Sequence, residues 1–267
     1  MITSKISEFQ DIIWDYYHDH RREMPWRENS NPYWVVVSEV MLQQTQVSRV
    51  SEKFPQFIDQ FSSFKELAKA SPASVITAWQ GLGYNRRALN LQKLAQTIDG
   101  DLPREPEELI KLPGIGPGTA GSIAAFAYDA PVVFIETNIR RVFIHHFFED
   151  QEGIDDKQLL PLVEEALDRE HPREWYYALM DYGSHLAKTV PNPNRRSKHH
   201  TVQSKFEGSD RQLRGAILRG LVGQPLSDKQ LIEHIECSDE ARFSKILNQL
   251  AKEGLVEQHR GRYRLPQ

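Results

Sequence analysis

The stretch LPGIGPGTAG, residues 112–121, constrains the fold of this chain more than any other part of its sequence. Gly114 and Gly116 permit backbone angles and close approaches that other residues resist. Pro117 suits the first turn of a helix, because the N–H that it lacks would have no helical partner there, and an apolar segment follows over residues 122–128. The pattern predicts a tight hairpin at a helix N-terminus whose N–H groups bind a phosphate, either of a small molecule or of a DNA backbone.

The bulk composition is that of a globular protein, and the chain of 267 residues is long enough for one large or two modest domains. No apolar run approaches the roughly 18 residues of a membrane span. The amphipathic N-terminus lacks the features of a secretory signal, so we expect a cytoplasmic protein, associated with the nucleoid if the source is prokaryotic. The single cysteine, Cys237, excludes internal disulfides and any cluster ligated by several cysteines.

Charge is distributed unevenly along a chain whose net charge is −4. Between Lys188 and Arg219 lie eight basic residues and two acidic ones, whereas acidic residues gather over residues 149–156. The net charge argues weakly against a nucleic-acid partner. A basic stripe on a mildly acidic body nevertheless suits an anionic polymer.

Apolar residues recur at helical intervals along most of the chain, and few stretches alternate with period two, so we predict an all-α body over residues 1–190 with two helical lobes. The expected helices span residues 5–20, 33–50, 51–61, 64–70, 71–80, 88–95, 105–111, 138–147, 156–169 and 173–187.

The C-terminal part of the chain has a different organisation. Residues 191–208 show no apolar periodicity and predict a basic linker. Beyond it, the pattern predicts helices over 211–222, 227–235 and 239–253, followed by a small hairpin around Gly261. Three helices and a hairpin over residues 209–267 resemble a winged-helix module.

Two glutamates are candidates for acid–base chemistry. Glu39 is flanked by apolar residues, and burial there would raise the pKa of its carboxyl toward neutrality. Glu136 follows an apolar run and precedes an expected helix. Taken alone, Glu39 also fits an ordinary surface glutamate, and Glu136 also fits a helix-start carboxylate favoured by the helix dipole.

The two carboxylates and the phosphate-binding hairpin between them in the chain suit hydrolysis of a glycosidic bond. One group protonates the leaving group, and the other stabilises an oxocarbenium-like centre. If the leaving group is a nucleobase, it must first leave the base stack and enter a pocket.

Several segments resemble the helix-hairpin-helix (HhH-GPD) DNA glycosylase superfamily, which includes endonuclease III and MutY. LPGIGPGTAG resembles the hairpin motif of that superfamily. Four further segments resemble the MutY-type adenine glycosylases: PWRENSNPYWVVVSEVMLQQTQV, WQGLGYNRRALNLQKLAQ, ETNIRRV and ALMDYG. The matches follow the family's order over about residues 8–187, and SEVMLQQTQV is the most specific. The resemblance implies an all-α glycosylase that acts, as a monomer, on double-stranded DNA with a mispaired or damaged base.

The resemblance also implies roles for individual residues. Glu39 matches the acid that protonates adenine at N7, Glu136 matches an aspartate that stabilises the oxocarbenium ion, and Asn138 matches an asparagine close to that centre. The lining of the extruded-adenine pocket matches Arg22, Met24, Trp26 and Arg27, with its acidic or polar partner at Asp181.

The implied DNA contacts lie in several parts of the chain. Gln44 and Tyr84 match residues that wedge into the duplex at the vacated site. The other expected DNA-binding residues are Gln43, Gly114, Gly116, Gly118, Thr119, Arg195, Arg196 and Lys198. The resemblance also implies that the backbone carbonyls of Ile110, Leu112 and Ile115 hold a monovalent cation, Na⁺ or K⁺. Each assignment has a plainer alternative: Trp26 as a core residue, Tyr84 as the cap of a helix end, and Arg22 and Arg27 as solvated side chains.

The segment after the expected helix 173–187 departs from the family. The family usually carries four cysteines there, which ligate an iron–sulfur cluster. Residues 189–200, TVPNPNRRSKHH, contain none, so we expect no such cluster. Arg195, Arg196 and Lys198 would then supply backbone contacts that the cluster loop otherwise positions. His199 and His200 lack an evident third partner for a metal.

Three further departures concern mechanism and recognition. Glu136 replaces an aspartate, which moves the carboxylate by about 1.5 Å, and a displacement of that size can cost about a hundredfold in rate. Gly118 stands where bifunctional relatives have a Schiff-base lysine, so we expect a monofunctional glycosylase without β-lyase activity. Residues 209–267 are too few for the family's nudix-like domain, which reads 8-oxoguanine. The winged-helix-like module at that place would bind duplex DNA or a protein.

The sequence therefore leaves three candidate functions open. The first is a monofunctional adenine glycosylase acting on adenine opposite 8-oxoguanine or guanine. The second is a mismatch glycosylase for thymine or uracil opposite guanine, or for a deaminated purine, as Glu136 and Gly118 suggest. The third is a non-catalytic lesion-binding DNA module.

Overall fold

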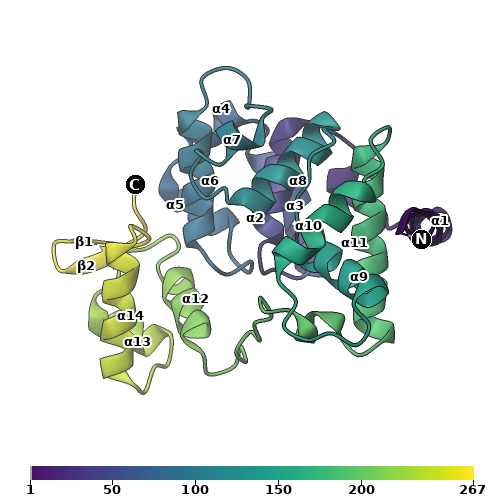
Figure 1. Ribbon diagram of the computed structural model, residues 1–267. Coiled ribbons are helices and arrows are strands. Elements are labelled where there is room, and N and C mark those ends of the chain that lie inside the picture. The colour runs from purple at the N-terminus through teal and green to yellow at the C-terminus, as the bar shows by residue number, and fades with distance from the viewer. Residues whose placement is uncertain (1) are drawn as a thin grey trace. The chain divides into compact units, whose positions relative to one another are not determined.

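A computed structural model describes residues 2–267, with side chains from Ser4 onward, and in this part of the chain the regular structure is helical apart from one short hairpin (Figure 1). The helices are α1 (Ile2–His20), α2 (Pro32–Leu42), α3 (Val47–Gln60), α4 (Phe64–Lys69), α5 (Pro72–Ala78), α6 (Arg86–Thr97), α7 (Pro106–Leu109), α8 (Pro117–Tyr128), α9 (Thr137–Phe147), α10 (Asp156–Glu165), α11 (Pro172–Thr189), α12 (Asp210–Gly220), α13 (Asp228–His234) and α14 (Glu240–Lys252). Two 3₁₀ turns, η1 (Pro25–Arg27) and η2 (Pro193–Arg196), and the antiparallel strands β1 (Glu257–His259) and β2 (Arg262–Arg264) complete the elements. The all-α prediction is confirmed.

The chain divides into two compact units, each built from separate stretches of sequence. The first unit comprises Met1–Val35, Pro103–Lys111 and Ile115–Val202; the second comprises Val36–Leu102, Leu112–Gly114 and Gln203–Gln267. Among the described residues, no helix is both long and apolar enough to cross a membrane.

The first unit is organised around α11, which packs against α1, α8 and α9. Its core is rich in aromatic rings: Phe126 stacks on Tyr177 with centroids 4.5 Å apart, and Phe134 lies 4.3 Å from Tyr176. Such pairs bury large apolar areas in fixed geometries. The core therefore holds α8 and the segment before α9 firmly against α11.

One buried cluster in the second unit joins α5 and α6 to the C-terminal module. Ile76 of α5 and Leu89 of α6 belong to the same buried cluster as Ile217 of α12 and Phe243 of α14. The backbone N–H of Ala73 donates to the carbonyl of Pro266 at 2.9 Å. The three helices and the hairpin expected at the C-terminus are present, and they are packed onto α5 and α6.

The helices expected over residues 33–50 and 156–169 both end earlier in the structure. The helix expected over residues 33–50 is interrupted after Leu42, because Gln44 adopts a left-handed backbone conformation (φ 56°) and the Thr45 N–H closes a turn onto the Leu42 carbonyl at 3.2 Å. The helix expected over 156–169 ends at Glu165. The spacing of apolar residues does not reveal a break in a helix when that spacing continues on both sides of the break.

The polar segment 191–208 is more ordered at its start than its composition suggests. The Asn192 side chain accepts from the N–H of Asn194 at 3.2 Å and caps η2. Ile154 and Ser197 then form a parallel β-bridge. The segment is thereby fastened to the first unit by backbone hydrogen bonds.

Candidate active site and nucleic-acid interface

Glu136 is the N-cap of α9 and lies at the centre of a polar cluster in the first unit. One carboxylate oxygen accepts from the backbone N–H groups of Asn138 at 2.6 Å and Ile139 at 3.0 Å, and the other accepts from the Asn138 amide at 3.4 Å. Burial raises the pKa of Glu136, while the two N–H groups and the charge of Arg141 act in the opposite direction. The geometry is that of a helix-start carboxylate, the plainer alternative, and the same hydrogen bonds fix the carboxylate in place. Its catalytic role stays a prediction.

Arg141 also holds this cluster together, and it is absent from the site residues expected from the sequence. Its Nη1 donates to the Asn138 amide oxygen at 2.6 Å and to the Gly183 carbonyl at 2.8 Å, and its Nε donates to Asn192 at 3.2 Å. The side chain is buried, and burial lowers its pKa while Glu136 raises it. The available signal was its position three residues after Asn138, on the same face of the helix.

Close backbone approaches fix the segment that carries Glu136. A Cβ built on Gly183 of α11 would lie 2.7 Å from the Cβ and 2.8 Å from the carbonyl oxygen of Asn138, and a Cβ on Gly121 of α8 would lie 2.4 Å from the Cβ of Phe134. Side chains at these two positions would push the segment away. The glycines thus set the position of Glu136 and Asn138.

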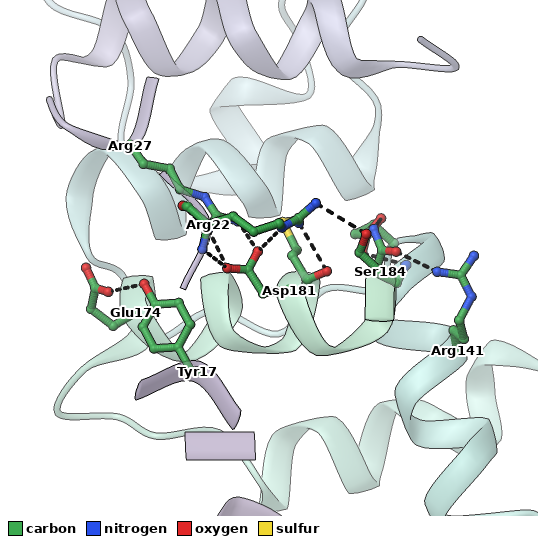
Figure 2. A network of polar contacts seen from close by, with 10 residues as sticks. Tyr17, Arg22, Arg27, Arg141, Glu174, Asp181 and Ser184 are labelled. Carbon is green, nitrogen blue, oxygen red and sulfur yellow. Dashed lines mark hydrogen bonds and ion pairs between the residues drawn. The ribbon is translucent and has the colours of Figure 1, made fainter. Parts of the chain in front are cut away.

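Asp181 of α11 binds two arginines in the first unit (Figure 2). Arg27 donates two hydrogen bonds to its carboxylate at 2.8 and 2.9 Å, and Arg22 donates from Nε at 2.7 Å and from its backbone N–H at 2.9 Å. The Asp181 side chain has no exposed surface, that of Arg27 is 4% exposed and that of Arg22 is 32% exposed. Such a buried, doubly paired carboxylate fixes both guanidinium groups.

The structure separates the alternatives for the expected pocket residues. Arg27 is not solvated, since its guanidinium lies 4.3 Å from the centroid of the Tyr177 ring and is buried. Trp26 in η1 and Met24 just before it are both buried, as core residues would be. Their contact with an extruded base remains a prediction, whereas Arg22, Arg27 and Asp181 are brought together as expected.

Glu39 lies in the second unit, on α2, half-buried between the fully buried Ser38 and Val40. The C-terminal end of this helix is fixed by Arg87, whose Nη1 donates to the carbonyls of Val40 at 2.6 Å and Met41 at 3.0 Å. Burial lowers the pKa of Arg87 to about 10. Sequence reasoning did not find this arginine, because its partners are main-chain carbonyls that lie more than 40 residues away in the chain.

The turns that carry Gln43, Gln44 and Tyr84 border one cavity of about 500 Å³ in the second unit. Gln44 and Tyr84 adopt left-handed backbone conformations, with φ of 56° and 45°. Arg87 links the two turns by donating to Thr45 Oγ1 at 2.9 Å and to the Gly83 carbonyl at 3.1 Å. The expected duplex-wedging residues therefore share one surface. Tyr84 lies in the turn between α5 and α6, whose helix caps are Trp79 and Asn85, so the plainer alternative of a helix cap does not describe it.

The glycine-rich hairpin opens α8 as predicted, but only one of its first two glycines needs special backbone freedom. Gly114 has φ 82°, whereas Gly116, the N-cap of α8, has φ −96° and ψ 173°, an extended conformation open to any residue. Gly118 and Thr119 lie in the first turn of α8, and a Cβ on Gly118 would sit 3.4 Å from the Ile135 carbonyl oxygen. The space at position 118 therefore admits a Cβ.

Of the basic residues in the segment 192–198, Arg196 turns its guanidinium inward. It donates to the carbonyls of Phe148 and Glu149 and, at 3.2 Å, to that of Ile144, and so satisfies the C-terminal end of α9. These contacts favour a structural role over the phosphate contact expected for it. Arg195 and Lys198 are exposed, and Lys198 lies 3.8 Å from Asp155.

The residues present do not fit a cysteine-ligated iron–sulfur cluster. Such a cluster requires four thiolates, and the chain has one cysteine, Cys237, in the turn between α13 and α14. Within residues 189–200, where the family usually carries its four cysteines, Asn194 is buried and donates to the Thr137 carbonyl at 2.9 Å. Among the described residues, no group of three His, Cys, Asp or Glu side chains could hold a metal ion, and His199 lies 4.0 Å from each of two aspartates.

A helical body in two units, a glycine-rich hairpin opening α8 and a capped carboxylate at α9 are the features expected from the resemblance to base-excision DNA-repair proteins, and the comparisons place the chain in that class. The family model described as "HhH-GPD superfamily base excision DNA repair protein" matches residues 37–168. Over 279 aligned residues the chain is 34% identical to the adenine DNA glycosylase of Mycolicibacterium smegmatis, with 95% of this chain and 93% of the relative covered. It is 32% identical to the adenine DNA glycosylase of Mus musculus, with 88% of this chain and 48% of the relative covered. The chain belongs to the adenine DNA glycosylase family within the HhH-GPD superfamily.

Solved structures share the fold at lower sequence identity. A thermostable thymine-DNA glycosylase superimposes with a TM-score of 0.63 and 22% identity over 71% of this chain and 91% of its own. Endonuclease III in a non-covalent complex with DNA gives a TM-score of 0.60 and 18% identity over 71% of this chain and 89% of its own. At these identities the likeness establishes the fold alone.

Proposed function

We propose that this chain is a monofunctional DNA glycosylase that removes adenine mispaired with 8-oxoguanine or guanine in duplex DNA, and that it acts as a monomer. The observation that carries the proposal is the anchoring of Arg22 and Arg27 on the buried carboxylate of Asp181. A guanidinium held in this way presents its remaining donors in a fixed geometry, which suits the ring nitrogens of a purine. The family's named activity supports adenine as that purine.

In the proposed mechanism Glu39 delivers a proton to N7 of the extruded adenine. The bond between C1′ of the sugar and N9 then breaks, and its electron pair leaves with the base. The Glu136 carboxylate stabilises the resulting oxocarbenium ion, a water molecule adds to C1′, and the proton of that water is released. The N–H groups of Asn138 and Ile139 favour the ionised form of Glu136 that this role requires.

The absence of β-lyase chemistry is part of the proposal. Strand cleavage by such an enzyme begins with attack of a primary amine on the sugar to form a Schiff base, and position 118 carries glycine. Hydrolysis would leave an abasic site in an intact strand.

The test uses a labelled duplex with a single adenine opposite 8-oxoguanine. Incubation with the protein followed by hot alkali should cut the labelled strand at the adenine, and the same sample without alkali should stay uncut. Glu39→Gln is the matched control, because it keeps the size and hydrogen-bonding capacity of the side chain and removes its acidity. A cut no stronger than that of Glu39→Gln would refute the proposal.

Replacing the adenine mispair by thymine or uracil opposite guanine, or by a deaminated purine, tests the second candidate, which Glu136 and Gly118 motivate. Exclusive release of adenine excludes it. Tight binding without release of any base would favour a lesion-binding module.

We also propose that the carbonyls of Ile110, Leu112 and Ile115 hold Na⁺ or K⁺ beside the DNA phosphate. Rings of backbone carbonyls suit such ions. If so, DNA binding at constant ionic strength weakens when KCl or NaCl is replaced by the chloride of a bulky organic cation.

A further inference from the structure

The cavity of about 500 Å³ in the second unit is lined by residues from three distant parts of the chain. The turn after α2 and the start of α3 supply one side, and the segment 80–90 supplies another. The third side belongs to the C-terminal module, mainly to α12, with Phe206 just before it. The cavity thus joins the expected duplex-wedging residues to a module whose partner the sequence left open.

The module is fixed in this position by both apolar and polar contacts. Leu218 of α12 lies in the same buried cluster as Ile76 of α5. At the cavity itself the Tyr84 hydroxyl accepts from the side chains of Gln203 at 2.5 Å and Arg211 at 3.4 Å. The guanidinium of Arg211 also lies 5.8 Å from the centroid of the Tyr84 ring. The face that α12 presents to the cavity is therefore set by the fold.

The cavity wall is strongly cationic in a chain of net charge −4. Among the described residues that line it are six arginines and one carboxylate, Glu253, which is bound to Arg214. Arg49, Arg86 and Arg219 have exposed side chains. Arginine presents a fork of donors that matches phosphate oxygens, and a concentration of this kind attracts a polyanion.

The remaining lining residues suit nucleic acid better than a protein or a small phosphate compound. Phe206 is 52% exposed at the cavity, and an exposed aromatic ring beside arginines is typical of surfaces that contact sugar and base. Gln43 and Gln44, in the turn after α2, add neutral donors and acceptors to the lining.

We propose that this cavity is a DNA-backbone site to which the C-terminal module contributes directly, with Arg219 of α12 and Arg86 of α6 contacting phosphates of the duplex. The module thus has DNA, not a protein, as its partner. The proposal rests on the proposed function only in taking duplex DNA as the substrate, and it assigns residues 209–267 to the same interface as the wedging residues.

The test measures the salt dependence of binding to a fully paired duplex, so that base excision plays no part. The loss of one phosphate contact makes the plot of log K against log[salt] less steep by about 0.9. When the salt is lowered from 200 to 50 mM, the affinity of such a variant should then rise by a factor roughly threefold smaller than that of the parent protein. Arg219→Ala and Arg86→Ala should each show this loss, and Arg219→Glu a larger one. Arg262→Ala is the matched control, because Arg262 is an exposed arginine of the same module outside the cavity lining.

An unchanged slope for both Arg219→Ala and Arg86→Ala overturns the proposal, as does an equal loss for Arg262→Ala. Thermal melts of the full-length variants check that the substitutions leave the fold intact. If adenine excision fails while the slopes fall as expected, the proposed function is wrong and the DNA site stands. If excision succeeds with unchanged slopes, only the DNA site is wrong.

Discussion

Replacing Gly183 by alanine tests whether the close approach of α11 to α9 positions Glu136 and Asn138, the proposed catalytic cluster. The added Cβ would lie 2.7 Å from the Cβ of Asn138 and 2.8 Å from its carbonyl oxygen. Ordinary carbon contacts are about 3.5–4.0 Å, so α9 would have to move by about 1 Å. Neither atom belongs to a flexible side-chain end, and Asn138 donates directly to Glu136.

The expected effects on stability and catalysis differ in size. Gly→Ala inside a helix gains about 1 kcal/mol when space is available, whereas overpacking costs about 1–3 kcal/mol. The free energy of unfolding should therefore fall by at most about 2 kcal/mol, and the protein should remain folded. A 1 Å displacement of catalytic groups costs about a hundredfold in rate, so chemistry should suffer more than folding.

Single-turnover excision with enzyme in excess over the DNA separates chemistry from binding. The control is Ala187→Ser, which also adds one heavy atom to α11 but at an exposed position. We expect a rate near that of the parent protein for Ala187→Ser and about a hundredfold lower rate for Gly183→Ala, with both variants folded by circular dichroism. Equal rates for the two variants would refute the argument that Gly183 positions Asn138.

Two further predictions concern the buried carboxylates. Asp181→Asn should destabilise the protein by about 3–5 kcal/mol, since it leaves Arg27 buried without a counter-ion. Asp156→Asn is the control, because it breaks the more exposed pair with Arg140 and should cost about 1 kcal/mol or less. Equal losses of stability for the two variants in denaturant titrations would contradict the larger loss expected for Asp181→Asn. Burial raises the pKa of Glu136, so the folded protein retains a proton that the unfolded chain releases above about pH 4.3. The free energy of unfolding of the parent protein, relative to that of Glu136→Gln, should therefore fall as the pH rises from about 4.3 to the raised pKa of Glu136. Thermal melts in which this difference increases with pH would contradict the prediction.

Local rules predicted the elements whose signals are local. Ser71 caps α5 by accepting from the N–H of Ser74 at 3.2 Å, as its place before Pro72 indicated. The three helices and the hairpin of the C-terminal module were likewise visible in apolar spacing and in Gly261 at the turn. The family assignment rested on contiguous motifs, which a single sequence displays in full, and the comparisons confirm it.

Contacts that depend on tertiary packing were not predictable. Arg87 and Arg141 both donate to groups more than 40 residues away, and each stands next to another arginine in the sequence. Arg196 was expected to contact DNA phosphates, but it satisfies carbonyls at the end of α9, a demand that exists only once α9 has formed. The sequence shows that an arginine is present, but tertiary packing decides which acceptors lie within hydrogen-bond distance of its guanidinium.

The segment ALMDYG illustrates how one helix serves both halves of the candidate site in the first unit. Asp181 and Gly183 are two positions apart, and at about 100° per residue they face nearly opposite sides of α11. On one side the carboxylate of Asp181 holds Arg22 and Arg27. On the other, Gly183 admits the first turn of α9, and its carbonyl accepts from Arg141. A rotation of α11 would therefore displace the two arginines and the Glu136 cluster together, so a single rigid helix fixes the proposed base pocket and the proposed catalytic carboxylate relative to each other.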